Sequence, residues 1–460
     1  MQRQFSLMQL PVCLLLLVTP LAPAQDAPGA ASVSLDTVHV PAPTGVIEAD
    51  RTNTQAAFDA VRPGGTVLFG AGTYLLGSGA SLTVPNVTVL GHREGTVLRG
   101  CDPEVFDEME DPEMAATKCT GLYVQTEGQT IQGLTFEYVW HGIVIGAYPT
   151  TEEEFRAIME SEELPSPLLA GGQRIEGNTF RASPNGLRVT GTEGAVSVVR
   201  DNDFIDVYHA IGFDGAPLHF INNRITVDEP RRIPNSHHQG SAVGILASPT
   251  HGCSGHIVAE NTIDGYHDGI SIVVFRGEVC RDVEILDNTI AVRRVAAPRT
   301  WRGVDPTGAD TTIVGVPISL HNFMQFIPMP GASEDDLEGV LEDILIRGNR
   351  IAGAEGIGIK VSHASQIRIV GNTITGIQRR VPFPGNTWGF PPMWATANGS
   401  AIWISPGSEG NEIAENVFED IEGDAVVLEG DQNQVVVLNS NDTVRDLGSG
   451  NVVTQRSEGH

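Results

Sequence analysis

The residue whose chemistry stands out is Lys360, one of only two lysines in the chain, the other being Lys118. It lies in the alternating stretch Gly358-Ile359-Lys360-Val361, and alternation turns its side chain away from its apolar neighbours. We therefore expect its ammonium to be exposed. A lysine amine can serve as the base that removes the C5 proton of a uronate while a cation neutralises the carboxylate. The alternative is an ordinary surface lysine.

A second set of polar residues recurs along the chain, each five positions beyond the apolar Phe or Ile of a repeated phrase. Its members are His141, Asn185, His209 and Asp268, with His267 beside the last. A histidine oriented by a carboxylate can act as a general base, and we expect His209 and Asp268 to lie within about 10 Å across one intervening coil. The alternative is a polar ladder that satisfies backbone groups at a turn.

Three long segments, 227–240, 291–312 and 375–399, concentrate positive charge and aromatic rings. Arginine pairs with carboxylates through two hydrogen bonds, and indole rings can stack on sugar rings, so these segments predict binding of a uronate-containing polymer. The alternative is that the arginines pair with nearby acids and the tryptophans pack the loops. The candidate binding residues are Arg231, Arg232, Arg293, Arg294, Trp301, Arg302, Arg379, Arg380, Trp388 and Trp394, with His238 as a further catalytic candidate.

The chain is strongly acidic, with 57 Asp and Glu against 28 Lys and Arg and a net charge of −29. This charge disfavours nonspecific nucleic-acid binding. Acid-rich stretches between Cys101 and Cys119 and over residues 151–163 could hold Ca²⁺, although their ligands have no fixed spacing. An ordinary acidic loop is the alternative, and no other cofactor is expected.

The amino terminus has the pattern of an export signal. Arg3 precedes an apolar run from Leu10 to Val18, and Ala22-Pro23-Ala24 fits a signal-peptidase site. We predict a signal peptide over 1–24, a secreted or periplasmic protein and no membrane association after cleavage. In that setting the remaining cysteines predict two disulfides, Cys101–Cys119 and Cys253–Cys280, and metal ligation by them is the weaker alternative.

One phrase recurs along the chain and sets its architecture. Its asparagines are Asn178, Asn202, Asn223, Asn261, Asn288, Asn349, Asn372 and Asn416. Their separations of 24, 21, 38, 27, 61, 23 and 44 indicate coils of roughly 21–27 residues, sometimes lengthened by an insertion or doubled. Coils of this length contain strands of only three to five residues, which must stack on one another to bury their apolar side. An asparagine at a fixed turn can form hydrogen bonds to the coils above and below, and it tolerates left-handed backbone.

These observations predict an all-β fold, a right-handed parallel β-helix over residues 46–453. Residues 52–61 should form a helix that caps its first coil, with an extension over 25–45 and a tail over 454–460. Because the long segments each follow an Asn-x-Ile phrase, they should leave the same turn and line one flank.

The sequence resembles the pectate-lyase-like superfamily of right-handed parallel β-helix proteins. That superfamily contains polysaccharide lyases, glycoside hydrolases, epimerases, esterases and non-catalytic adhesins. The stretch from Glu355 to Lys360 is similar to the strand of alginate-lyase and dermatan-lyase relatives in which the lysine is the base, but their following serine is Val361 here, and the next coil lacks their arginine. Gly212-Phe213-Asp214 is similar to part of an epimerase motif and lacks its Pro-His.

The favoured function is an exported lyase acting on an acidic polysaccharide. A glycoside hydrolase on the same scaffold and a non-catalytic carbohydrate-binding solenoid remain the alternatives.

Overall fold

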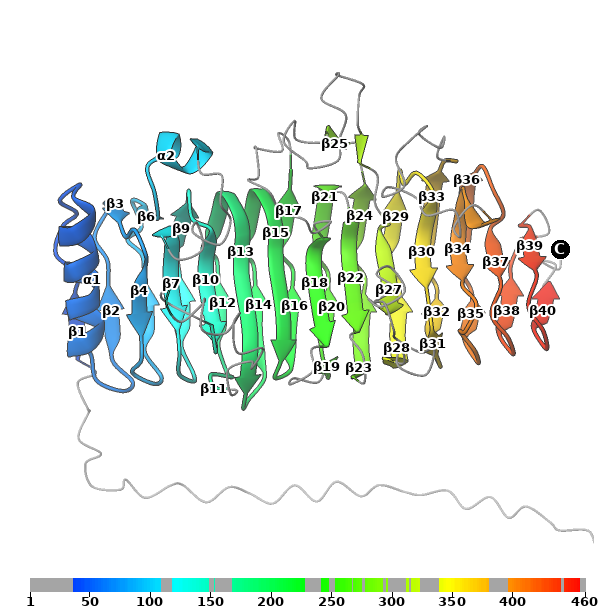
Figure 1. Ribbon diagram of the computed structural model, residues 1–460, viewed down its shortest axis with the longest axis horizontal. Coiled ribbons are helices and arrows are strands. Elements are labelled where there is room, and N and C mark those ends of the chain that lie inside the picture. Colours follow the sequence, from blue (N-terminus) through cyan, green and yellow to red (C-terminus); the bar gives the residue numbers. More distant parts are fainter. Residues whose placement is uncertain are drawn as a thin grey trace, which may run out of the picture. The chain divides into compact units, whose positions relative to one another are not determined.

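The computed structural model describes residues 36–108, 118–148, 153, 168–227, 241–247, 253–266, 268–274, 278–292, 295–296, 312–313, 316–322, 339–379, 396–439 and 442–455. Within the compact unit Asp36–His460, 38 strands form one continuous, coiled sheet in which the pairings are parallel. Successive coils stack along one axis (Figure 1). The expected parallel β-helix is confirmed.

Each coil contributes strands to up to three faces. Face 1 contains β1 (Thr37–His39), β2 (Thr66–Leu68), β5 (Thr88–Leu90), β8 (Thr130–Gln132), β12 (Arg174–Glu176), β14 (Ser197–Arg200), β16 (Leu218–Ile221), β20 (Ile257–Ala259), β23 (Val279–Leu286), β28 (Val340–Arg347), β32 (Arg368–Val370), β35 (Glu412–Ala414), β38 (Gln434–Val437) and β40 (Val452–Gln455). Face 2 contains β3 (Gly72–Leu75), β6 (Thr96–Arg99), β9 (Leu134–Glu137), the first parts of β13 (Thr179–Glu193) and β15 (Asp203–Gly215), β17 (Arg224–Thr226), β21 (Thr262–Tyr266), β24 (Thr289–Val292), β29 (Arg350–Ala352), β33 (Thr373–Ile377) and β36 (Val417–Ile421).

Face 3 carries the residues of functional interest. It contains β4 (Ala80–Leu82), β7 (Thr120–Val124), β10 (His141–Gly146), the second parts of β13 and β15, β18 (Ser241–Ala247), β22 (Asp268–Val274), β27 (Ile318–Asn322), β30 (Ile357–Val361), β34 (Ser400–Ile404), β37 (Val426–Leu428) and β39 (Val444–Asp446). Short strands β11 (Leu168–Leu169), β19 (Cys253–Ser254) and β31 (Ala364–Ser365) add to the stack, and β25 (Val295–Ala296) pairs with β26 (Thr312–Ile313) in an antiparallel hairpin.

The core consists of apolar ladders that run from coil to coil inside the three faces. Phe136, Phe180 and Phe204 show the pattern: their rings stack nearly parallel with centroids 4.9 and 4.8 Å apart. This is the spacing of neighbouring strands, so in-register pairing places like side chains in direct contact.

The eight repeated asparagines form an unbroken hydrogen-bonded ladder at the corner between faces 1 and 2. In each of the seven steps, the backbone N–H of one asparagine donates to the Oδ1 of the next at 2.9–3.0 Å. All eight side chains are at most 2% exposed. Because Asn288 bonds to Asn349 and Asn372 to Asn416, the separations of 61 and 44 are single lengthened coils.

The left-handed backbone at this corner belongs to the residue before each ladder asparagine. Its φ lies between 51° and 69° at Gly177, Asp201, Asn222, Glu260, Asp287, Gly348, Gly371 and Glu415. The expectation that the ladder asparagines supply this conformation is therefore corrected. Glycine, Asp and Asn tolerate positive φ at low cost, which explains their frequency before the repeated asparagine.

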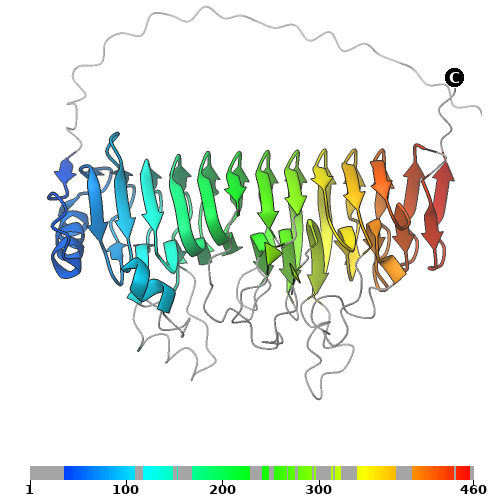
Figure 2. The same cartoon turned by 90° about the horizontal axis from the view of Figure 1, so that it is seen from above.

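The helix expected over 52–61 is α1 (Ile47–Ala60), and it lies at the amino-terminal end of the stack (Figures 1 and 2). Its Phe58 is 1% exposed and packs into the core, covering the open end of the first coils. Asp50 anchors it, because its carboxylate accepts hydrogen bonds from the backbone N–H of Thr44 at 2.7 Å and of Leu75 at 3.1 Å. Strand β1 pairs with β2, so strand pairing begins within the 25–45 segment.

Both predicted disulfides are present. Cys101 and Cys119 have Cα atoms 5.3 Å apart, close to the second helix α2 (Pro103–Glu108). Cys253 and Cys280 are in-register neighbours on β19 and β23, with Cα atoms 4.4 Å apart. Among the described residues, no helix is both long and apolar enough to cross a bilayer. The predicted signal peptide lies outside the described residues.

A second corner, between faces 3 and 1, contains a buried histidine where other coils use glutamine or asparagine. His256 Nδ1 accepts the backbone N–H of Leu218 at 3.1 Å, as Gln173 Oε1 accepts that of Gln129 at 2.9 Å. Burial lowers the pKa of His256 to about 4, and the nearby His219 contributes in the same direction. The ring is therefore neutral in the folded protein near pH 7.

We predict that Asn288→Ala lowers the free energy of unfolding by about 2–3 kcal/mol, because it leaves several buried backbone and amide groups of the two adjacent coils unsatisfied. Urea unfolding would measure the loss. Thr289→Ala, at the exposed next position, is the matched control and should cost much less. Equal costs would contradict the structural role of the ladder.

We predict that His256→Gln makes the protein less sensitive to acid. Because the pKa of His256 is lower in the folded than in the unfolded protein, this residue does not affect stability above about pH 6.5. As the pH falls from 6.5 toward 4, only the unfolded chain takes up the proton, so the free energy of unfolding decreases. Glutamine keeps the acceptor and does not titrate. Thermal unfolding at pH 6.5 and 4.5 should show a smaller difference in the variant; an unchanged difference would refute this explanation.

Candidate functional site

One outward-facing line of side chains on face 3 contains Lys360. We call it the Lys360 row, and it consists of Ser81, Tyr123, Val144, Arg188, Gly212, Gly244, Ser271, Ser319, Lys360, Trp403, Val427 and Arg445, aligned by strand pairing. The residues on either side of Lys360, Ile359 and Val361, belong to the core, so the lysine points away from it. The predicted outward direction is confirmed.

The predicted exposure of Lys360 is wrong, because the side chain is only 1% exposed. A small apolar cluster of Ile357, Ala397, Trp403 and Val427 is separate from the main core, and it includes Trp403, the residue paired with Lys360 on the next coil. Alternation fixes the direction of a side chain, but the packing around it decides whether water reaches it.

Burial gives Lys360 an unusual protonation state. Loss of hydration lowers its pKa to about 7, and the negative charge of Asp268 opposes this change in part. Asp268 lies at the start of β22, where its Oδ1 accepts the backbone N–H of Val316 at 2.6 Å. A substantial fraction of the lysine is therefore a neutral amine near pH 7, the form that can accept a proton.

Two histidines complete the group around Lys360. Burial lowers the pKa of His321 to about 3, with a further lowering by Lys360 and an opposing effect of Asp268. Its Nδ1 lies 3.0 Å from the hydroxyl of Ser319, the residue paired with Lys360. His363 remains partly exposed, and burial and Lys360 both lower its pKa. The Lys360 cluster thus consists of Asp268, Ser319, His321, Lys360 and His363, with neutral imidazoles beside an amine.

The second predicted set is aligned as expected. His141, Asn185 and His209 are consecutive partners on β10, β13 and β15. Ser241 lies between the coils of His209 and Asp268, so these two are two strand spacings apart, about 10 Å. The structure brings Asp268 into electrostatic contact with Lys360, which joins members of the two candidate sets that the sequence kept separate.

The three long segments leave the described strands at one corner. They follow β17, β24 and β33 of face 2 and return at β18, β27 and β34 of face 3. Among their candidate binding residues, Arg379 is exposed, and its backbone N–H donates to Glu422 at 2.7 Å. Outside the described residues lie Arg231, Arg232, His238, His267, Arg293, Arg294, Trp301, Arg302, Arg380, Trp388 and Trp394, and also most of the two acid-rich stretches.

Sequence reasoning missed Ser319, His321 and His363. The stretch Ile318-Ser319-Leu320-His321 has the same alternation as the Lys360 strand, which was the available signal. This stretch lies about 30 residues from the nearest repeated asparagine, in a coil lengthened to 61 residues. Its register with the Lys360 strand could therefore not be predicted from the sequence.

No group of three or more His, Cys, Asp or Glu residues within the described ranges is arranged to hold a metal ion. The Ca²⁺ expectation concerned the acid-rich stretches and stays a prediction.

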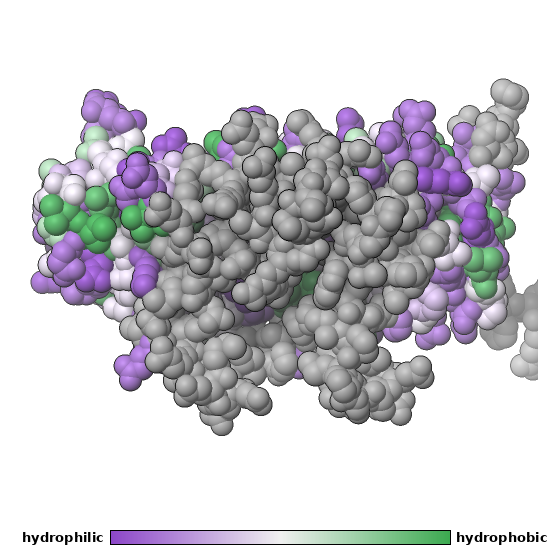
Figure 3. All heavy atoms as spheres, turned by 45° about the horizontal axis from the view of Figure 1, so that its top comes forward, coloured by the Kyte–Doolittle hydropathy of each residue, from purple (hydrophilic) through white to green (hydrophobic). Residues whose placement is uncertain are grey.

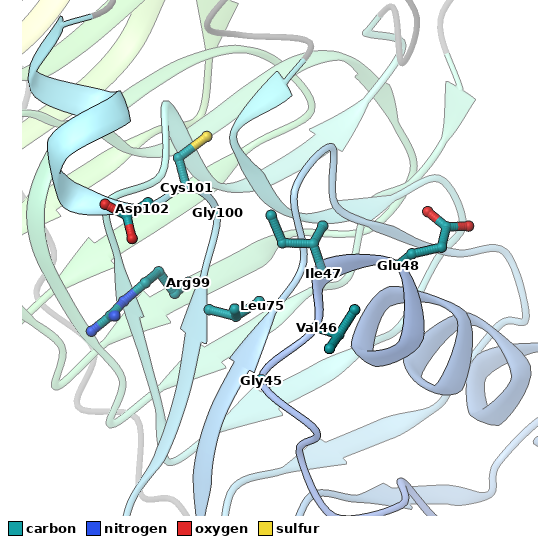
Figure 4. A pocket seen from close by; sticks show the side chains of 9 residues that line it. All are labelled: Gly45, Val46, Ile47, Glu48, Leu75, Arg99, Gly100, Cys101 and Asp102. Carbon is teal, nitrogen blue, oxygen red and sulfur yellow. The ribbon is translucent and has the colours of Figure 1, made fainter.

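A pocket of about 430 Å³ lies elsewhere, at the amino-terminal end of the stack (Figure 4). It is lined by Gly45, Val46, Ile47, Glu48, Leu75, Arg99, Gly100, Cys101 and Asp102. Hydrophobic and hydrophilic surface adjoin at this end of the protein (Figure 3). Figure 4 shows Glu48 and Arg99 pointing apart, and Arg99 is bonded to Glu137, so its lining brings no reactive groups together.

Comparison with known proteins agrees with the architecture. Residues 336–457 match the family model described as right handed beta helix region. No curated protein matches the sequence. Similar solved structures include the catalytic unit of a GH87 alpha-1,3-glucanase from Streptomyces thermodiastaticus, with 14% identity over 95% of this chain and 72% of that chain and a TM-score of 0.48.

Two further solved structures are similar at the same level. A PL6 alginate lyase in complex with a trisaccharide has 15% identity over 92% of this chain and 85% of that chain, with a TM-score of 0.46. A family 28 exopolygalacturonase of Yersinia enterocolitica has 12% identity over 92% of this chain and 78% of that chain, with a TM-score of 0.44. At these identities the likeness concerns the fold alone. The chain is a right-handed parallel β-helix protein, as its resemblance to the pectate-lyase-like superfamily implied.

Proposed function

We propose that this protein is an exported polysaccharide lyase that cleaves a uronate-containing polymer by β-elimination, with Lys360 as the base. The observation that supports this most directly is the buried Lys360 on the outward side of face 3, whose pKa of about 7 leaves part of it unprotonated at neutral pH. A surface lysine would be almost fully protonated there and could not accept a proton.

The elimination follows from this protonation state. The Lys360 amine takes the C5 proton of the uronate, the electrons of that C–H bond form the C4–C5 double bond, and the C4–O4 bond breaks. The proton now on Lys360 is then available to the departing O4. Neutral His321 and the Ser319 hydroxyl offer hydrogen bonds to the substrate carboxylate as its charge grows.

This arrangement differs from that of the lyase relatives. The residue paired with Lys360 on the next coil is Trp403, and that coil has no arginine to match the acid of the lyases that the Lys360 strand resembles. The proposal therefore gives both proton transfers to Lys360. Since the lysine is buried, it also requires that polymer binding uncover this part of face 3.

We predict that Lys360→Arg lowers kcat/KM by about 10²–10⁴-fold, because arginine keeps the positive charge but cannot release its proton at neutral pH. Activity is followed by the absorbance of unsaturated uronates released from alginate, pectate and glycosaminoglycans. Lys118→Arg, at the exposed other lysine, is the control and should behave like the wild type.

Two outcomes of this assay contradict the proposal. New reducing ends without unsaturated products would favour the glycoside hydrolase. Polymer binding without new ends, unaffected by Lys360→Arg, would favour the non-catalytic solenoid.

We predict that Asp268→Asn shifts the acidic limb of the kcat/KM profile to lower pH. Wild-type activity should rise through about pH 7 as Lys360 loses its proton. Asp268 holds that pKa up, so removing its charge lowers the pKa further, while the amide oxygen still accepts the Val316 N–H. A limb that stays in place would show that Asp268 does not act on the base.

A further inference from the structure

A second polar group lies on the same outward face, far from Lys360 along the stack. Arg188, the member of the Lys360 row on β13, points away from the core because Leu187 and Val189 on either side belong to it. Its side chain is 29% exposed, and its Nη2 lies 3.8 Å from Asp214 Oδ2. Within the described part of the chain, Arg188 donates no hydrogen bond, so its fork of donors is available to a ligand.

Asp214 holds Arg188 without occupying those donors. The Asp214 oxygens accept the Gly191 N–H at 2.6 Å and the Thr190 hydroxyl at 3.1 Å. Asp214 is 3% exposed, and the Gly191 N–H and the Thr190 hydroxyl stabilise its charge. The more exposed group of the pair is the Arg188 guanidinium. The guanidinium also lies over the glycine next in the row, since a Cβ on Gly212 would be 3.1 Å from Arg188 Nη1.

A histidine and a tyrosine lie beside Arg188. His141 Nε2 is 3.2 Å from the Tyr148 hydroxyl, and the two rings meet edge to face at 5.2 Å. His141 is 5% exposed, and its Nδ1 is buried with no hydrogen-bond partner in the described structure. Burial, with a contribution from Arg188, lowers the pKa of His141 to about 3, so the ring is neutral and retains a polar atom without a partner.

The row between Arg188 and Lys360 is made of small residues. Gly212, Gly244, Ser271 and Ser319 occupy the four intervening coils. Five strand spacings, about 24 Å, separate Arg188 from Lys360. The row contains Arg188, Lys360 and Arg445 and no carboxylate, in a chain with a net charge of −29. Ser271 and Ser319 are each 5% exposed, so an extended chain can lie along this row only when polymer binding uncovers it, as the proposed function already requires at Lys360.

We propose that Arg188, with His141 and Tyr148, forms a non-reacting subsite that binds a carboxylate of the same polymer whose other end reaches Lys360. The inference rests on the proposed function and adds a length requirement to it. Arginine binds a carboxylate through two charge-assisted hydrogen bonds, and the neutral imidazole and phenol can donate or accept toward the neighbouring hydroxyls of that sugar. Only a chain long enough to span the glycine and serine stretch engages both sites.

The test compares Arg188→Gln with Arg200→Gln in the full chain. Arg200, on β14, pairs with Glu176 at 3.1 Å and faces a different side of the stack, so its variant loses the same charge and a similar ion pair. With a long polyuronate, Arg188→Gln should raise KM about ten-fold and change kcat by less than two-fold, the pattern of lost uniform binding. With uronate trimers, which cannot span the row, KM should stay unchanged. Arg200→Gln should match the wild type throughout.

Several results would overturn the subsite. They are an unchanged KM for the polymer, an equal loss with trimers, or an equal loss in Arg200→Gln. Arg188→Lys checks for misfolding: it keeps the charge and should fall between the wild type and Arg188→Gln, with an unchanged melting temperature.

Failure of the proposed function is recognised separately, because the wild type then releases no unsaturated product from any polymer. In that case the subsite is tested by affinity electrophoresis of the full-length variants in gels containing alginate or pectate, where polymer binding retards the protein. Weaker retardation of Arg188→Gln alone supports the subsite, and equal retardation of both variants refutes it.

Discussion

The structure depends on a side-chain amide that bonds to the coil on either side of it. Strands of three to five residues bury too little surface to hold a fixed position alone, so something must set the height of each coil on the next. The asparagine ladder does this through buried hydrogen bonds of nearly constant length. Because the strands beside the ladder then pair in register, every outward side chain on face 3 lies one strand spacing from its neighbours. The alignment of Ser319 with Lys360 is a consequence of this repeat.

Burial then changes the chemistry of the aligned residues. An amine placed on a β-helix surface would remain an ammonium, but Lys360 is only 1% exposed, and this removal from water disfavours its charged form. Asp268 works in the opposite direction and keeps the pKa close to neutrality. At His321 burial is the largest cause and Lys360 adds to the lowering of the pKa, while Asp268 opposes it, so the ring stays neutral. At His363 burial and Lys360 both lower the pKa. Desolvation is therefore the largest cause at all three groups, and Asp268 opposes it at Lys360 and His321.

The sequence predicted what depends on local patterns. Asn288 and its seven counterparts identified the coils, alternation around Ile359 gave the direction of Lys360, and cysteines 253 and 280 gave a disulfide. It did not predict the burial of Lys360, because alternation gives the direction of a side chain and not the packing around it. Nor did it bring Asp268 and Lys360 together. The direct bond between Asn288 and Asn349 and the pairing of β24 with β29 show that these 61 residues form a single coil. The strands that carry Asp268 and Lys360 are therefore only two strand spacings apart.

The positions of the lengthened coils separate the requirements of the fold from those of the site. The ladder at the corner of faces 1 and 2 continues at 2.9 Å through coils of 61 and 44 residues, so the added chain does not disturb it. The extra residues lie between β24 and β27 and between β33 and β34, at the corner of faces 2 and 3, and in the 61-residue coil also between β27 on face 3 and β28 on face 1. Loop closure grows slowly in cost with loop length. A coil can therefore gain residues at these two corners while its height in the stack stays fixed by an asparagine at the third corner. Under the proposed function, differences in the polymer that is bound can arise in these segments without any change in the residues that hold the coils together.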